Sequence, residues 1–211
     1  MANVKSIAEP KTRRKDPTER RAEIVSAASH IAVAEGLERV TAKRVAEELG
    51  VVPGLVNHYF SSVDDLVAVA FGFAAQRERA EIYALAAHAG SPVAQVKHLL
   101  GELLDLERDA VSLLWLDAWQ ASRRRPALLA EVLVQMDADA SHLARLIDAG
   151  VAAGEFSVDD AASVAVRIMA LVDGHSVQAA ARSREDSRIV SAFAIRASET
   201  ELGLPSGALA R

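Results

Sequence analysis

The chain of 211 residues has no cysteine, and aromatic residues make up only 4% of it. The lack of cysteine excludes a disulfide framework and any thiolate metal site. Long hydrophobic runs are also missing: the longest apolar stretch, residues 66–75, is far shorter than the roughly 20 residues that span a bilayer. The N-terminus lacks the apolar core of a signal peptide. We therefore expect a soluble cytoplasmic protein with no membrane partner.

Motifs of common enzymes are absent as well. There is no His-Glu-x-x-His, no Gly-x-Ser-x-Gly and no glycine loop that could cradle a phosphate. The histidines, at 30, 58, 88, 98, 142 and 175, include no pair at metal-ligand spacing. A catalytic site assembled from distant residues stays open as an alternative, but no pattern indicates one. We expect no catalytic residues, no metal and no cofactor.

Alanine, leucine and valine dominate the hydrophobic residues, which make up 51% of the chain. This composition favours packed helices over a β-sandwich, and no strand-like alternation of useful length occurs. The sequence predicts an all-α fold of about nine helices, three in an N-terminal domain and six in a C-terminal domain. Beyond residue 62, we expect helices at 64–87, 91–108, 110–122, 126–153, 157–182 and 187–202.

Residues at the helix ends support these ranges. Asp16 followed by Pro17 is a strong start for the first helix, which we expect to reach Gly36. Ser157, with Asp160 three residues later, resembles a capping box. Residues 1–15 are basic and poor in apolar side chains, so they are predicted to be a disordered arm. Residues 203–211 are predicted to be a disordered tail.

Residues 40–60, VTAKRVAEELGVVPGLVNHYF, predict two short helices joined by a tight turn. Thr41 is placed to cap the first helix, and Gly50 follows its last apolar position. Pro53 suits the first turn of the second helix. This pattern is typical of the helix-turn-helix of DNA-binding proteins, whose second helix lies in the major groove. Residues 16–62 would then form a three-helix DNA-binding domain.

The charge distribution supports a DNA partner despite a net charge of −5. Residues 1–60 carry ten Lys/Arg and eight Asp/Glu, a net of +2, whereas residues 61–211 carry fourteen and twenty-one, a net of −7. Phosphate would attract the first part and repel the second. The alternative is an ordinary solvated surface with a basic tail.

Several side chains in this stretch have chemistry suited to DNA. Thr41 and Lys43 are placed for phosphate contact, and Arg44 could donate two hydrogen bonds to a guanine edge. Gly54 permits a close backbone approach. The full set of predicted DNA-binding residues is Thr41, Lys43, Arg44, Pro53, Gly54, Asn57, His58 and Tyr59.

The stretch TAKRVAEELGVVPGLVNHYFSSVDDL resembles the signature of the TetR (tetracycline-repressor) family of transcriptional regulators. Its His-Tyr-Phe ending is similar to the betaine/choline-regulator branch. Two positions depart from the family pattern: Val52 stands where Ser or Thr is usual, and Val63 where Lys is usual. The resemblance implies a repressor that binds a palindromic operator as a homodimer and leaves it when a small molecule binds to residues 63–202. The rival hypothesis is a helical protein-interaction module without sequence-specific DNA binding.

The resemblance also implies that the last two helices form a four-helix dimer interface. Both carry apolar faces that need a partner, and one short recognition helix reads too few bases alone. The predicted dimerisation residues are Ile168, Met169, Val172, Gly174, Ile189 and Phe193. The alternative is that these helices only close a monomeric core. Asp173 and Gly174 look like an Asp-Gly pair of the family in this helix.

Trp115 and Trp119 are four residues apart and therefore share one helix face. Two indoles side by side can receive a cation such as a quaternary ammonium, so we predict an effector site there. Further predicted walls are Phe73, Tyr83 and His142. The alternative is that the tryptophans only fill the core, as we expect of Leu100, Leu104, Met136 and Met169.

Overall fold

The computed structural model describes residues 16–105, 109–181 and 183–210, and every regular element in these ranges is helical. The all-α prediction is confirmed. The predicted arm at residues 1–15 lies outside the described residues, as does the predicted helix end at Arg108. None of the described helices is both long and apolar enough to cross a membrane.

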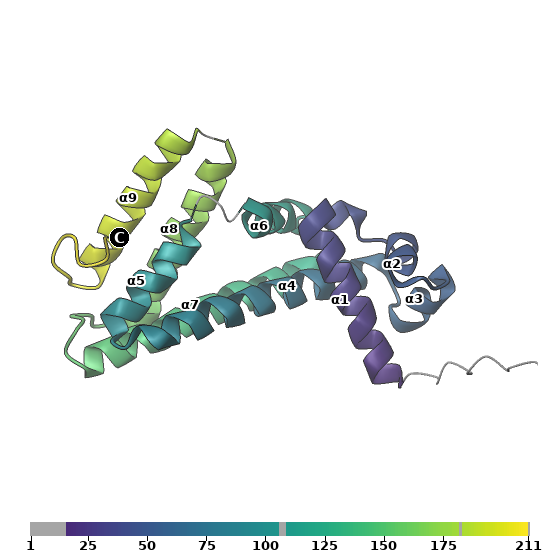
Figure 1. Cartoon of the computed structure of the whole chain (residues 1–211), viewed down its shortest axis with the longest axis horizontal. Coiled ribbons are helices and arrows are strands. Elements are labelled where there is room, and N and C mark those ends of the chain that lie inside the picture. Colours follow the sequence, from purple (N-terminus) through teal and green to yellow (C-terminus); the bar gives the residue numbers. More distant parts are fainter. Residues whose placement is uncertain (1–15, 106–108, 182, 211) are drawn as a thin grey trace, which may run out of the picture.

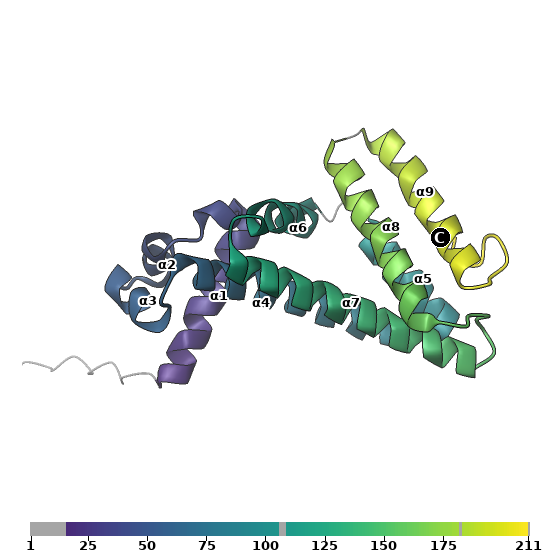
Figure 2. The ribbon, with the colours of Figure 1, turned by 180° about the vertical axis from the view of Figure 1, so that it is seen from behind.

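The described part of the chain contains nine α helices and two short 3-10 helices (Figure 1). Figures 1 and 2 show α1, α2 and α3 at one end of an elongated molecule and α5, α8 and α9 at the other, with α4 and α7 running side by side between them. The helices are α1 (Pro17–Glu35), α2 (Ala42–Leu49), α3 (Pro53–Tyr59), α4 (Val63–Ala86), α5 (Pro92–Leu103), α6 (Asp109–Ser122), α7 (Pro126–Ala152), α8 (Ala161–Ala181) and α9 (Arg184–Glu201), with η1 at Leu37–Arg39 and η2 at Ala87–Ala89.

The start of α8 differs from the prediction. Helix α8 begins at Ala161 and is capped by Asp160, whose Oδ1 accepts a hydrogen bond from the Ser163 N–H at 3.0 Å. The capping role predicted for Ser157 is therefore wrong. Its backbone N–H instead donates to the carbonyl of Leu202 at 3.1 Å, which ties the turn before α8 to the end of α9.

The tail after α9 is ordered through residue 210, so the prediction of disorder from residue 203 is wrong. Leu209 is 1% exposed and packs in the hydrophobic core. The backbone N–H groups of Gly207 and Leu209 donate to the carboxylate of Glu199 at 3.0 and 2.8 Å. A buried carboxylate that accepts backbone N–H groups fixes a segment that its glycine and proline content suggests is loose.

The hydrophobic core has two parts. The first joins α1, α2 and α3 to the beginning of α4, and it also takes in Leu114 of α6 and Leu128 of α7. The second gathers the far ends of α4 and α7 with α5, α8 and α9. Packing therefore continues across the predicted boundary at residue 62, and α4 and α7 link the two cores.

Candidate nucleic-acid interface and effector cavity

The helix-turn-helix is built from local interactions. Thr41 is extended, and its Oγ1 accepts from the Arg44 N–H at 3.1 Å, which caps α2. Gly50 ends α2 with a φ of 64°, a left-handed conformation that glycine adopts without steric cost. The Val51 N–H then donates to the Ala46 carbonyl at 2.9 Å. This tight turn joins α2 to α3, as the sequence predicted.

One face of α3 is open to solvent. Its inner face is anchored by Val56 and, at the C-cap, by Phe60, which are both buried. The exposed residues of this segment are Val52, Pro53, Gly54, Asn57 and His58, and Thr41 and Lys43 are exposed on the neighbouring α2 segment. Tyr59 is half-buried, and its ring meets that of His58 edge-on at 5.3 Å. Contact of these residues with DNA stays a prediction.

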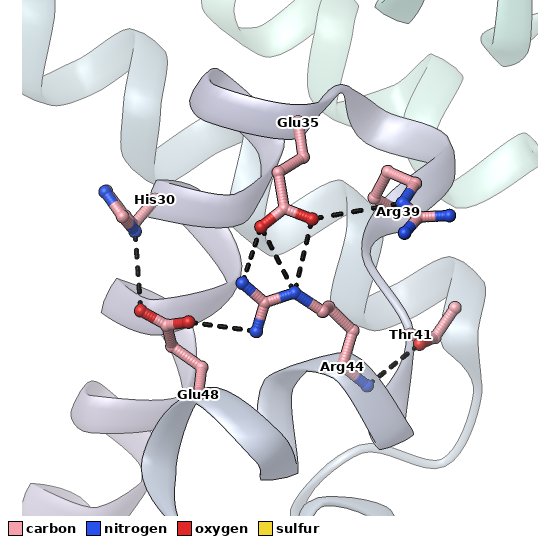
Figure 3. A network of polar contacts seen from close by, with 6 residues as sticks. All are labelled: His30, Glu35, Arg39, Thr41, Arg44 and Glu48. Atoms are coloured by element: carbon pink, nitrogen blue, oxygen red, sulfur yellow. Dashed lines mark hydrogen bonds and ion pairs between the residues drawn. The ribbon is translucent and has the colours of Figure 1, made fainter.

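Arg44 is held by carboxylates rather than projecting freely (Figure 3). Its Nε lies 3.1 and 3.2 Å from the two carboxylate oxygens of Glu35, and its Nη1 lies 2.9 Å from Glu48. The hydrogen bond from Arg44 lowers the pKa of Glu35, and the bonds to Glu35 and Glu48 raise the pKa of Arg44. His30 and Arg39 extend the network at 3.7 and 3.9 Å. Arg44 thus fastens α2 to α1, a role that its sequence position did not indicate.

A cavity of about 220 Å³ lies between α4, α5, α6, α7 and α8. Trp115, Trp119 and Tyr83 line it, as predicted for an effector site. The two indole rings are 5.7 Å apart at 45°, and Trp115 also packs edge-on against Phe71 of the first core at 4.9 Å. The tryptophans therefore serve both as core residues and as cavity wall.

Phe73 and His142 do not line this cavity, so their placement on its wall is wrong. Phe73 is 39% exposed on the surface of α4. The His142 Nδ1 is 2.9 Å from the Ala138 carbonyl, and its ring lies behind Tyr83 at 5.1 Å. Met136 and Met169, which were expected to be core, do line the cavity.

The acid that distinguishes the cavity is Asp173, which the effector prediction missed. It lines the cavity beside Asp139, and no hydrogen bond or ion pair joins it to another residue in the described ranges. Burial, and then the charge of Asp139, raise the pKa of Asp173 to about 6. Asp139 itself is paired with Arg79 at 2.8 Å. Glu78 and the exposed Asp137 also line the cavity, and Asp173 is the half-buried acid there that makes no ion pair in the described ranges. The sequence did offer a signal for this residue, because Asp173 is an acid within an otherwise largely apolar helix, α8.

The predicted dimerisation residues divide into two groups. Ile168 and Val172 are 0% and 5% exposed in the second core, so their assignment to a dimer surface is wrong. Met169 faces the cavity. Gly174, Ile189 and Phe193 are exposed, and their place in an interface stays a prediction. With Val166 and Val177 they give α8 and α9 an exposed surface rich in apolar groups.

The described residues contain no cluster of three or more His, Asp or Glu side chains arranged to hold an ion. The cavity offers an aromatic wall and carboxylates instead, which suits an organic cation.

Comparisons with known proteins agree with this architecture. Residues 24–70 match the model of bacterial regulatory proteins of the tetR family, and residues 92–197 match the C-terminal model of BetI-type transcriptional repressors. The HTH-type transcriptional regulator PksA of Bacillus subtilis is 27% identical over 96 residues, which span 46% of this chain and about half (47%) of PksA.

Solved structures extend the likeness to most of the chain. A putative TetR-family regulator from Rhodococcus sp. is 25% identical with a TM-score of 0.72, and the match covers 88% of this chain and 99% of that one. A putative regulator from Saccharomonospora viridis, solved in complex with choline, shares the fold at 21% identity, a TM-score of 0.68 and coverage of 84% and 94%. The chain belongs to the TetR family of transcriptional regulators.

Proposed function

We propose that the protein is a ligand-responsive repressor that binds a palindromic operator as a homodimer and leaves it when a small cation occupies the cavity. The observation that carries the proposal is the exposed face of α3, which the Gly50 turn joins to α2. In such motifs the second helix enters the major groove while the first crosses the backbone.

The proposed DNA contacts fall into two kinds. Thr41 and Lys43, at the start of α2, would meet phosphates, because a helix N-terminus and a lysine both favour an anion. Pro53, Gly54 and Asn57 would approach the bases, and His58 and the Tyr59 hydroxyl would lie nearer the backbone. The net charge of +2 over residues 1–60 favours this orientation.

The proposed dimer would form through the exposed faces of α8 and α9. Val166, Ile189 and Phe193 are 58%, 65% and 56% exposed, and a second copy would cover them. A twofold pair could then read half-sites about 34–36 Å apart, or multiples of that spacing. We expect Phe193→Asp to give a monomer in sedimentation experiments, with Leu85→Asp, a similarly exposed apolar position (57%) on α4, remaining dimeric. A dimeric Phe193→Asp variant would contradict this interface.

The proposed effector is a small organic cation. Asp173 supplies a carboxylate without a partner in the described ranges, and Trp115 and Trp119 supply faces that attract a cation. Arg79 already pairs with Asp139, so Asp173 is the half-buried carboxylate that we assign to the cation. The choline bound by the Saccharomonospora viridis regulator makes choline a suitable first probe.

The test is selection of genomic double-stranded DNA on the full chain at two salt concentrations, with sequencing of the retained fragments. The proposal predicts a palindromic motif, with affinity that falls steeply as salt rises because phosphate contacts release counterions. Retention of no sequence at either salt would contradict it and favour a helical interaction module.

A further inference from the structure

Helix α3 exposes an uncharged surface. No Lys or Arg occurs between Val51 and Phe60. Val52, directly before the helix, is 71% exposed, the largest exposed fraction among the large hydrophobic side chains in the described ranges. Its side chain makes no capping hydrogen bond, and the buried anchors of this segment are Val56 and Phe60. The local fold therefore gives Val52 no packing role.

The two cations of the neighbouring helix α2 lie close to carboxylates. Arg44 is held by Glu35 and Glu48 (Figure 3), which leaves its side chain 27% exposed. Lys43 lies on the first turn of α2, 3.9 Å from Glu47, and is placed for a phosphate rather than for a base. Neither is arranged to give the bidentate contact by which Arg and Lys recognise guanine.

Base edges in the major groove differ in the side chains that they favour. Guanine favours Arg or Lys, adenine favours the amide of Asn or Gln, and the thymine methyl group favours an apolar side chain. The first residues of a recognition helix are those that reach base edges. The exposed residues of the α3 segment include an apolar side chain, Val52 at the N-cap, and an amide, Asn57. They include no Arg or Lys that could recognise guanine.

We propose that α3 recognises A·T pairs at the core of each half-site, with the Val52 methyl groups against a thymine methyl and the Asn57 amide on an adenine. The proposal rests on the proposed function, because it requires α3 to enter the major groove. The proposal goes beyond that function by naming the bases that α3 selects. It also gives the exposed Val52 side chain a specific role, since contact with the C5-methyl group would bury its apolar surface.

The experiment begins with the operator recovered by selection. Each thymine of a half-site is replaced in turn by deoxyuridine, which removes only the methyl group, and the dissociation constant is measured for each duplex. Replacement of one particular thymine by deoxyuridine should lower the affinity about four-fold per half-site, which is the change expected when one buried methyl group is lost. Val52→Ala should bind the thymine operator more weakly and should be indifferent to deoxyuridine at that position.

Two controls separate this proposal from a general loss of binding. Val63, which is 43% exposed at the start of α4, is the matched valine, so Val63→Ala should keep the sensitivity to deoxyuridine. Asn57→Ala should lose preference at one adenine and keep the response at the thymine read by Val52.

The outcomes are distinguishable. If no motif is recovered, the proposed function fails, and this inference fails with it. If a motif is recovered but no thymine responds to deoxyuridine, or if Val52→Ala responds as the native protein does, only the inference is overturned. The inference would also be overturned if substitutions at Val52 and Asn57 changed the preference only at G·C pairs of the half-site.

Discussion

The recognition surface and the effector cavity handle charge in opposite ways. On the surface, Arg44 and Glu35 satisfy each other between α1 and α2, so the motif is held in shape by groups that water also solvates. In the cavity, Asp173 is partly buried and has no ionic partner in the described ranges. Unpaired charge in a low-dielectric site costs free energy and is therefore a mark of function. The difference agrees with the proposal that the cavity binds a small cation.

The largest effect on stability is expected when a buried ion pair is broken. Arg79, 9% exposed, donates to Asp139 at 2.8 Å and to the Gln135 carbonyl at 3.1 Å. Arg79→Ala would remove the guanidinium that pairs with Asp139, whose side chain is only 20% exposed, so the free energy of unfolding should fall by about 3–5 kcal/mol. The measurement is urea denaturation followed by circular dichroism.

The matched control for that substitution lies two residues away. Arg77 on the same helix makes an exposed pair with Glu81 at 3.6 Å, and pairs of this kind contribute less than about 1 kcal/mol. Equal losses for Arg77→Ala and Arg79→Ala would show that burial does not separate the two pairs.

A smaller effect, with a pH dependence, is expected for Asp173→Asn. The folded-state pKa is about 6 against an ordinary value of 3.8, so the folded state holds the proton more tightly than the unfolded state. Stability of the native protein should therefore fall as pH rises from about 4 to about 7, by up to about 3 kcal/mol. The neutral amide lacks this loss, so the variant should be the more stable protein at pH 7. Parallel pH profiles in urea denaturation would contradict the assignment.

The smallest effect, on both base preference and stability, is expected for Arg44 of the helix-turn-helix. Because Arg44 is tied to Glu35 and Glu48, we expect Arg44→Ala to keep the base preferences of the operator and to change stability much less than Arg79→Ala. The measurement is DNA selection with the variant beside the native protein. Loss of preference at a guanine would show that Arg44 leaves its carboxylates and contacts the base, as the sequence alone predicted.

The two regions also differ in how far the sequence predicts them. The helix-turn-helix lies within about twenty consecutive residues, and its cap at Thr41 and its turn at Gly50 are local signals. The cavity draws on five helices, so the approach of Asp173 to Trp115 depends on packing that no short pattern encodes. For the same reason the sequence wrongly placed Phe73 and His142 in the cavity lining.

The sequence also could not predict which side chains of a long helix point into the core. Ile168 and Ile189 are equally apolar in sequence, yet one is 0% and the other 65% exposed. The tail shows the same dependence on distant groups, because Leu209 is ordered by the carboxylate of Glu199. Arg44 could be read as a free cation because Glu35, its partner, is nine residues earlier on another helix.

The most direct test of the account is the coupling between the two regions. The operator dissociation constant is measured with and without saturating choline, and the choline dissociation constant with and without saturating operator, for the native protein and for Asp173→Asn. Linkage requires that each ligand weaken the other by the same factor, and we expect a factor on the order of 5–150 in the native protein and little choline binding in the variant. Choline that binds the native protein and leaves operator affinity unchanged would contradict the account.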